Sequence, residues 1–440
     1  MADVTAAEKE WFGHPRGLAT LFFTEMWERF SYYGMRALLI LYMVGSVQQP
    51  GLGFGEKHAA TIYGVYTMLV YLMGIPGGFI ADRWLGHYRA VLIGGIIIAC
   101  GHFSMAVPGM PFFFAGLGLI VIGTGLLKPN VSTIVGTLYS KEDTRRDSGF
   151  SIFYMGINLG AFIAPLVTGY LGQKINWHIG FGAAGVGMTL GLIQYVAGKK
   201  YLVARSTAKT PQTKMVEAAV APKARLSGDD WMRIGAIAIL SLFALMFWAG
   251  FEQAGSSLNL FADRATRLTI LGYNYPSSWF QSVEPLFVII FAPFFAWMWI
   301  RLGPREPSSP VKFTLGLVFL TLSFALIVPA AHLSERGGYR VSPLWLIGLY
   351  FLQAVGELCL SPVGLSLVTK LSPARVVGLM MGVWFLATAL GNYVAGWAAG
   401  FLQNRSFSQV FESALISIAI AAVILLLLLR PIRRMMGEVH

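Results

Sequence analysis

Ionisable side chains stand inside long apolar stretches of this sequence. The acids are Glu25, Glu28, Glu252, Glu284 and Glu357, and the bases are Arg29, Arg36 and Lys128. A charge at the centre of a bilayer costs about 2.5–3.5 kcal/mol on insertion scales, so such residues are functional candidates. The five carboxylates outnumber the three cations, and a carboxylate without a partner in a low dielectric tends to hold a proton. We therefore expect at least one of these glutamates to alternate between a proton-bound and an ion-paired state.

The first apolar stretch has the highest density of such residues. On a helix, Glu25, Arg29, Tyr32 or Tyr33, and Arg36 recur at positions that share one stripe, with Glu28 beside it. This stripe cannot face lipid, so we expect it to face a wet cavity. The alternative is a set of self-neutralising ion pairs that only fix helix packing, although buried ion pairs are a poor source of stability.

Lys128 lies in the segment G-T-G-L-L-K-P-N, residues 123–130. The spacing does not match a nucleotide-binding loop, and no Ser or Thr follows the lysine. We interpret Lys128 as a cavity cation beside a locally broken helix. The sequence has no H-E-x-x-H, no G-x-S-x-G and no Cys/His cluster, and its two cysteines lie in apolar runs. We therefore expect that the protein is not an enzyme and binds no metal or cofactor. The glutamates within the spans suit a transporter that is driven by protons as the coupling ion.

These residues must be positioned by membrane helices. The chain has 440 residues, of which 56% are hydrophobic and 12% charged, and soluble domains are less apolar and carry about twice that share of charge. Runs of about 18 or more apolar residues predict twelve spans in an all-α polytopic membrane protein. They cover residues 20–45, 58–81, 88–107, 111–139, 148–170, 178–202, 231–262, 278–301, 312–331, 343–369, 376–402 and 409–430.

A hydrophilic stretch divides the spans six and six. The expected organisation is a cytoplasmic N-terminus (1–19), a first six-helix bundle (20–202), a cytoplasmic linker (203–230), a second six-helix bundle (231–430) and a cytoplasmic tail (431–440). Most Lys and Arg residues outside the spans fall on the side of the two termini, which places that side in the cytoplasm. The net charge of +12 is thus a topology signal, and nucleic-acid binding is not needed to explain it.

Two resemblances follow from motifs. The loop G-G-F-I-A-D-R-W-L-G-H-Y-R, residues 77–89, resembles the loop 2–3 signature of the major facilitator superfamily, and Asp82, Arg83 and Arg89 there can form a breakable charge latch. The first span resembles the E-x-x-E-R-F-x-Y-Y-G signature of the proton-coupled oligopeptide transporter family. Further family-like segments occupy residues 153–160, 247–256, 356–364 and 378–386.

The resemblance implies symport of di- and tripeptides with protons by alternating access, at a site between the two halves. Matched position by position, Glu25, Glu28 and Arg29 correspond to the cluster for proton coupling and the peptide carboxylate. Cavity residues are Tyr33, Arg36, Tyr71, Lys128, Asn158, Trp248, Glu252 and Trp384, and Glu357 corresponds to the acid that receives the peptide ammonium. A zwitterionic peptide fits such a site, because it needs a cationic end and an anionic end. We further expect Lys128 to pair with Glu252 or Glu357 in one state and to be released by protonation.

Two departures from the family pattern stand out. Glu284, in Q-S-V-E-P, occupies a position where the family usually has asparagine. This extra carboxylate predicts either a preference for cationic peptides or a second titrating group, unless a local partner neutralises it. The linker is also too short for the two extra helices that many bacterial relatives carry between the halves.

Other functions remain open at this stage. The same fold could carry another small zwitterion or anion, such as an amino acid, nitrate or a peptide-like drug, and direction of transport follows the proton gradient. A passive channel would lack ion pairs within the spans, and a membrane enzyme would need a catalytic constellation. We expect a protein of the bacterial inner membrane that functions as a monomer, with short peptides and the lipid bilayer as its partners.

Overall fold

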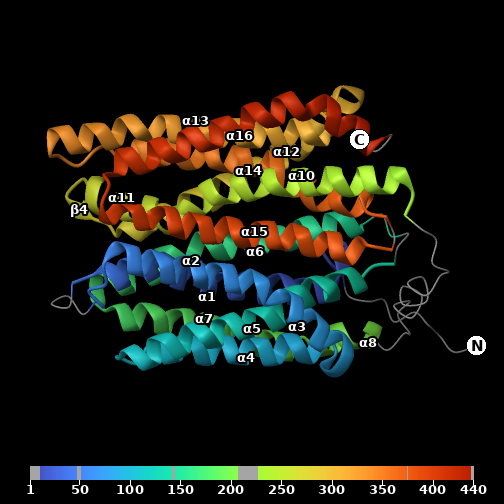
Figure 1. Ribbon diagram of the computed structural model, residues 1–440. Coiled ribbons are helices and arrows are strands. Elements are labelled where there is room, and N and C mark those ends of the chain that lie inside the picture. Colours follow the sequence, from blue (N-terminus) through green and yellow to red (C-terminus); the bar gives the residue numbers. More distant parts are fainter. Residues whose placement is uncertain are drawn as a thin grey trace, which may run out of the picture. The chain divides into compact units, whose positions relative to one another are not determined.

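The computed structural model describes residues 10–46, 51–140, 143, 145–206, 226–373 and 375–437. Nearly all of these residues are helical (Figure 1). Two short hairpins are the exception: β1 (Glu10–Trp11) pairs with β2 (His14–Pro15), and β3 (Thr269–Ile270) pairs with β4 (Tyr273–Asn274). Most of the predicted linker falls on residues 207–225, outside the described ranges.

The helices follow the predicted spans in order. Those before the linker are α1 (Arg16–Val44), α2 (Glu56–Leu72), α3 (Gly74–Ile80), η1 (Ala81–Leu85), α4 (His87–Met105), α5 (Met110–Thr137), α6 (Arg146–Tyr170), η2 (Leu171–Ile175), α7 (Trp177–Ala197) and α8 (Lys199–Ser206). Those after it are α10 (Gly228–Phe251), η3 (Glu252–Gly255), α11 (Ser257–Ala265), η4 (Ser277–Ser282), α12 (Val283–Leu302), η5 (Gly303–Arg305), α13 (Ser309–Gly337), α14 (Leu344–Leu371), α15 (Val377–Ala399), η6 (Gly400–Gln403) and α16 (Phe407–Met436).

Eleven helical stretches of the described chain are long and apolar enough to cross a membrane, the shortest having 19 residues. At 1.5 Å per residue, about 20 residues cross the hydrocarbon core. Helix α1, with 29 residues, is also long enough, but its glutamates and arginines make it too charged to pass the same criterion. With α1 included, each of the twelve predicted spans corresponds to a helical stretch.

The helix through Lys128 corrects one prediction. Helix α5 runs without interruption from Met110 to Thr137 and contains Pro129, so the expected local break beside Lys128 is wrong. Side chains can satisfy the backbone groups that a proline frees within a membrane helix. Here Asn130 Nδ2 donates to the carbonyl oxygen of Leu126, three residues before Pro129, at 2.7 Å.

The chain divides into two compact units. Unit 1 comprises residues 1–35 and 73–217, and unit 2 comprises residues 36–72 and 218–440. The division therefore runs through α1, between Met35 and Arg36, and groups α2 with the helices that follow the linker. The predicted boundaries of the two six-helix bundles differ from these units and stay a prediction.

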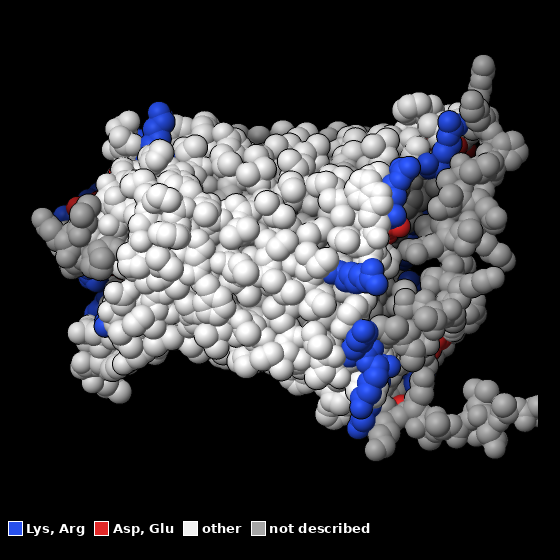
Figure 2. Space-filling view, turned by 90° about the horizontal axis from the view of Figure 1, so that it is seen from below, with Lys and Arg blue, Asp and Glu red and all other residues white. Residues whose placement is uncertain are grey.

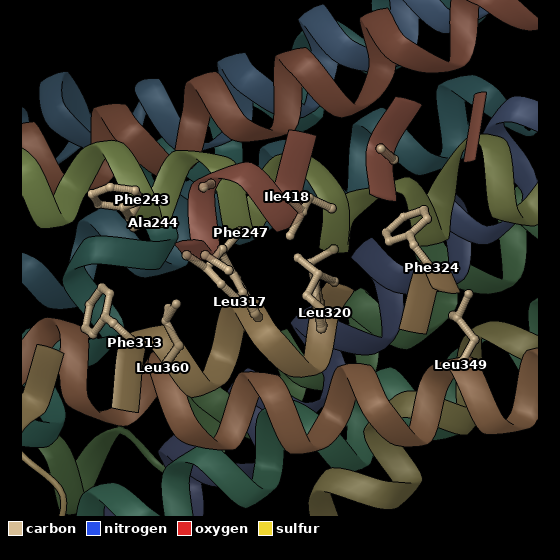
Figure 3. Packing of buried hydrophobic residues seen from close by; sticks show 14 of the residues in the cluster. Phe243, Ala244, Phe247, Phe313, Leu317, Leu320, Phe324, Leu349, Leu360 and Ile418 are labelled. Atoms are coloured by element: carbon tan, nitrogen blue, oxygen red, sulfur yellow. The ribbon is translucent and has the colours of Figure 1, made fainter. Parts of the chain in front are cut away.

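Unit 2 is held together by a large hydrophobic core. Phe243 and Phe247 of α10 meet Phe313, Leu317 and Leu320 of α13, with further side chains from α14 and α16 around them (Figure 3). Each of these five side chains is at most 5% exposed. Within a bilayer the hydrophobic effect does not drive helices together, so van der Waals packing of this kind stabilises their association.

Unit 1 has its own core, built from α1, α4, α5, α6 and α7. Leu18 and Leu21 of α1 belong to it, together with Leu127 of α5 and Met188 of α7. All four are fully buried. Each unit therefore positions its own charged residues on a packed framework.

Glycines allow helices within each unit to approach closely. In unit 2, a Cβ atom added to Gly396 of α15 would lie 2.4 Å from the Cα of Gly64 in α2. In unit 1, a Cβ at Gly77 of α3 would lie 1.9 Å from the carbonyl oxygen of Gly125 in α5. These distances are shorter than van der Waals contact, so only glycine fits at Gly396 and Gly77. Small residues at such crossings are typical of membrane helices.

The charged surface residues have a polarised distribution. On the face shown in Figure 2, Lys and Arg gather toward two opposite ends, and the band between them is uncharged. Large apolar side chains such as Phe112, Ile122 and Leu190 are exposed on the protein surface. Such a band suits the hydrocarbon core of a bilayer, and the flanking cations suit its headgroups.

The close contact at Gly396 generates a first prediction. Gly396→Ala should destabilise the protein by about 1–3 kcal/mol, because an overpacked contact forces backbones apart. The measurement is thermal unfolding in detergent. The matched control is Gly382→Ala in the same helix, where an added Cβ meets nothing within 4 Å. Equal unfolding temperatures for the two variants would contradict the close approach of α2 and α15.

Candidate functional site

The first group of charges lies on α1 in unit 1. Arg29 forms a bidentate hydrogen-bonded ion pair with Glu28, in which Nη2 donates to Oε1 at 2.8 Å, and its Nε lies 3.3 Å from Oε1 of Glu25. The three residues are 0–3% exposed. We call Glu25, Glu28 and Arg29 the unit 1 cluster. It carries one negative charge in excess when all three groups are ionised.

Residues around the unit 1 cluster adjust this excess. The guanidinium carbon of Arg29 lies 5.1 Å from the ring centre of Tyr32 and 5.9 Å from that of Tyr33, within cation–π range. Lys128 of α5 interacts electrostatically with Glu25 and can balance the excess. Both predictions for the stripe, a wet cavity or self-neutralising ion pairs, allow the pairing of Arg29 with Glu28 and Glu25, so both stay predictions.

Helix α6 of unit 1 carries two further residues of interest, Asn158 and Gly160. A Cβ at Gly160 would lie 2.2 Å from the carbonyl oxygen of Met26, so the glycine lets α6 pack directly against α1 at the unit 1 cluster. Asn158 is 7% exposed, and its Nδ2 donates to the carbonyl oxygen of Tyr154 at 3.1 Å within α6. Its side-chain oxygen thus has lone pairs available for a ligand.

Unit 2 contains a second charged pair, formed by residues far apart in the sequence. Nη2 of Arg36, in α1, lies 2.8 Å from Oε2 of Glu252. Both side chains are at most 5% exposed. Glu252 is the first residue of η3, the 3₁₀ segment that separates α10 from α11. Such interruptions of the helix are common where membrane proteins bind ions or substrates.

Two contacts fix the position of this pair. Asn259 of α11 donates from Nδ2 to the carbonyl oxygen of Ala37 at 2.9 Å, which ties the two segments together one residue beyond Arg36. Gly255, at the end of η3, provides space: a Cβ there would lie 1.8 Å from Tyr63 Oη and 2.7 Å from Arg36 Nε. The glycine therefore lets Tyr63 and Arg36 sit directly against the interrupted helix.

Two more carboxyl groups complete the site in unit 2. Glu284 lies in the first turn of α12, and its side chain hydrogen-bonds with that of Glu357 from α14. Glu284 also interacts electrostatically with Glu252 and Arg36, and Tyr350 of α14 interacts with Arg36 and Glu284. We call Arg36, Glu252, Glu284, Tyr350 and Glu357 the unit 2 cluster. It holds three carboxyl groups around one guanidinium.

The aromatic residues predicted for the cavity also lie in unit 2. Trp384 is 6% exposed and packs edge-to-face on Phe313, with ring centres 5.9 Å apart. Trp248 and Tyr71 are half-buried, and Nε1 of Trp248 is a buried donor without an acceptor. Trp384 thus belongs to the packed core, whereas Trp248 keeps a donor available.

The predicted latch residues lie where η1 meets α4 in unit 1. Among the described residues, Asp82 pairs with His87, Nε2 to Oδ1 at 3.6 Å, rather than with Arg83 or Arg89. Arg83 instead lies over the ring of Phe79, 5.8 Å from its centre. His87 also hydrogen-bonds Asn130 at 2.7 Å through Nδ1. A latch that uses Arg83 or Arg89 stays a prediction.

The sequence did not point to three residues of the unit 2 site, Tyr63, Gly255 and Tyr350. Tyr350, Gln353 and Glu357 recur at i, i+3 and i+7, which places them on one face of α14. This polar spacing in an apolar helix was a usable signal. No local pattern marks Tyr63 or Gly255, because their role depends on contacts between distant segments.

The geometry defines a class of protein. A bundle of membrane helices holds two buried groups of ion-paired carboxylates and arginines, and the described residues contain no group of His, Cys, Asp and Glu able to bind a metal ion. Such groups can exchange protons and bind charged ligands within the membrane, which is the equipment of a transporter.

The comparisons with known proteins agree with this class. The chain matches the POT family (PTR2) over residues 88–228 and 205–416. It is 40% identical to the peptide transporter YePEPT of Yersinia enterocolitica, over 99% of this chain and 98% of the relative. It is 36% identical to a di-/tripeptide transporter of Lactococcus lactis subsp. cremoris, over the full length of both. A crystal structure of a peptide transporter POT in complex with alafosfalin superposes with a TM-score of 0.88 at 42% identity, covering 98% of each chain.

The chain belongs to the POT family, the proton-coupled oligopeptide transporters. The predicted fold of the major facilitator superfamily is confirmed, and the protein is an integral, multi-pass membrane protein. Its matched relatives are transporters and not enzymes.

The tight space beside Gly255 generates a second prediction. Gly255→Ala should destabilise the protein by about 1–3 kcal/mol, since the added methyl group overlaps Tyr63 Oη. Tyr63→Phe in the same chain removes that oxygen, the closest of the contacts, and should recover part of the loss, while Arg36 Nε at 2.7 Å still crowds the methyl group. Thermal unfolding of the two single variants and the double variant measures the coupling. Additive losses in the double variant would show that Tyr63 and Gly255 do not share this space.

Proposed function

We propose that this protein is a proton-coupled symporter of di- and tripeptides that works by alternating access. Membership of the POT family and the similarity to named peptide transporters support the cargo. The unit 2 cluster supports the chemistry, because it offers a cation and several carboxyl groups to a ligand that is itself a zwitterion. The peptide carboxylate would bind to Arg29, Arg36 and Lys128, and the peptide ammonium to Glu357.

The observation that carries this proposal is the buried ion pair between Arg36 and Glu252. Removing one partner of a buried pair leaves an uncompensated charge and costs about 3–5 kcal/mol. A proton on Glu252 and a carboxylate on Arg36 together avoid that cost, whereas either alone does not. Proton and peptide therefore favour each other's binding, which is the coupling that symport requires.

The unit 1 cluster is proposed to take part in the same exchange. Arg29 shares its charge between Glu25 and Glu28, and Lys128 interacts with Glu25. A peptide carboxylate that engages Arg29 or Lys128 would leave a glutamate without a full partner, and this glutamate would then bind a proton. Asn158 and Tyr33 are proposed to hydrogen-bond the peptide backbone, with Tyr71, Trp248 and Trp384 as surrounding apolar walls.

The proposal also includes the coupling ion, the oligomeric state and the orientation of the protein in the membrane. Protons serve as the coupling ion without another cofactor, and the protein works as a monomer in the bacterial inner membrane. Both termini lie in the cytoplasm, as the distribution of Lys and Arg in the sequence favours. Asp82, Arg83 and Arg89 form a latch that opens and closes with the transport cycle.

Uptake of labelled dialanine into proteoliposomes tests the proposal. We expect accumulation with an inward proton gradient, none without it, and competition by unlabelled di- and tripeptides. Free alanine and nitrate serve as competitors for the alternative cargoes. Competition by either of them but not by peptides, or a lack of uptake by folded protein, would contradict the peptide assignment.

A third prediction concerns Glu252. Glu252→Gln cannot exchange a proton, so accumulation driven by a proton gradient should fall to the level seen without a gradient. Exchange of labelled for unlabelled dialanine across the membrane should persist, because exchange needs no net proton movement. The matched control is Glu412→Gln, which removes a carboxylate that pairs with His332 outside both clusters. If Glu252→Gln shows undiminished gradient-driven uptake, another group than Glu252 carries the coupled proton.

A fourth prediction concerns Lys128. Lys128→Ala removes the cation that interacts with Glu25 and that was expected to pair with a glutamate of the second bundle in one state. Proton-driven uptake of dialanine should be lost or nearly lost. Uptake at the wild-type rate would exclude Lys128 from the coupling mechanism.

A further inference from the structure

The unit 2 cluster has one more carboxyl group than a zwitterionic peptide needs. Arg36 and Glu252 neutralise each other across 2.8 Å. Glu284 and Glu357 form a hydrogen bond with one another. Two carboxyl groups can share a hydrogen bond only when at least one of them carries a proton, so this pair has at least one exchangeable proton.

Several buried polar atoms without hydrogen bonds belong to this carboxyl pair or to the helix that carries Glu357. Oε1 of Glu284 is a buried acceptor without a hydrogen bond, and so is Oη of Tyr350. Gln353, on the same face of α14, has neither its Nε2 nor its Oε1 paired. Tyr350 and Gln353 are both fully buried. Buried polar groups are normally paired, so these atoms mark a place built to receive polar groups of a ligand.

The charge of the pair determines which ligand groups fit. With its proton, the pair matches one cation, such as the ammonium of a neutral peptide. Without the proton it carries two negative charges, and two cations neutralise it. The free oxygen of Glu284 offers the second cation a direct acceptor.

We propose that Glu284 and Glu357 together form a site for two cationic groups, the N-terminal ammonium of a short peptide and the side-chain cation of a lysine or arginine within it. Glu284 is then the residue that makes this transporter favour basic di- and tripeptides over neutral ones. The inference rests on the proposed peptide transport, and it adds the preferred class of peptide.

The test compares two peptides that differ in charge and hardly in shape, lysyl-alanine and norleucyl-alanine. Each competes with labelled dialanine for uptake at neutral pH. In the wild type, lysyl-alanine should halve uptake at about a tenfold lower concentration, as expected of one additional charged hydrogen bond. In Glu284→Gln, the two peptides should compete about equally. Glu412→Gln is the matched control and should keep the wild-type preference.

A second readout separates this inference from the transport proposal. The rise in unfolding temperature caused by each peptide in detergent reports binding without transport. Lysyl-alanine should stabilise the wild type more than norleucyl-alanine, and Glu284→Gln should remove the difference; Glu284→Asn replaces it if that variant does not fold. An equal preference in wild type and variant, or no preference in the wild type, would overturn the inference. Selective binding with no uptake of any peptide would instead overturn the transport proposal.

Discussion

The ion pair between Arg36 and Glu252 is the interaction on which the rest of this structure depends. Neither charge can be left alone in a membrane interior, so the two residues must meet, although more than two hundred positions separate them in the sequence. Their meeting requires an interrupted helix at η3, a glycine at position 255 that admits Arg36, and a hydrogen bond from Asn259 to the backbone beside Arg36. When a ligand binds Arg36 in place of Glu252, the charge of Glu252 must be neutralised in another way. Protonation of Glu252 is the simplest way.

The two clusters differ in how their buried carboxylates are neutralised. In the unit 1 cluster, Arg29 is shared by two carboxylates of its own helix, so its charge balance is set locally and adjusted by Lys128. In the unit 2 cluster, charges from four helical segments converge, and three carboxyl groups face one guanidinium. The first arrangement is fixed by helical spacing alone. The second depends on tertiary packing, so movements of helices can change it.

Much of the fold could be predicted from the sequence, because long apolar runs leave a membrane helix as the only option, and each predicted span has a helical counterpart. The charged residues were also identifiable, since Glu25, Arg29, Arg36, Glu252, Glu284 and Glu357 interrupt such runs. The partner of Glu252 in this structure, Arg36, was not identified; the expected pairing of Lys128 with Glu252 or Glu357 in one state stays a prediction. Pairing depends on which helices pack together, and that choice is made by contacts such as those of Gly64 and Gly255, which no local pattern reveals. The predicted break beside Lys128 was wrong, because α5 continues through Pro129, where the side chain of Asn130 donates to the carbonyl oxygen of Leu126.

The central claim is that a peptide replaces Glu252 as the partner of Arg36 while Glu252 takes up a proton. Infrared difference spectroscopy on the protein in lipid, with and without dialanine at mildly acidic pH, measures this directly through the carbonyl band of a protonated carboxyl group. The account predicts that dialanine increases this band in the wild type and that the increase is missing in Glu252→Gln. The same increase in both proteins would contradict it, since the proton would then bind to another group.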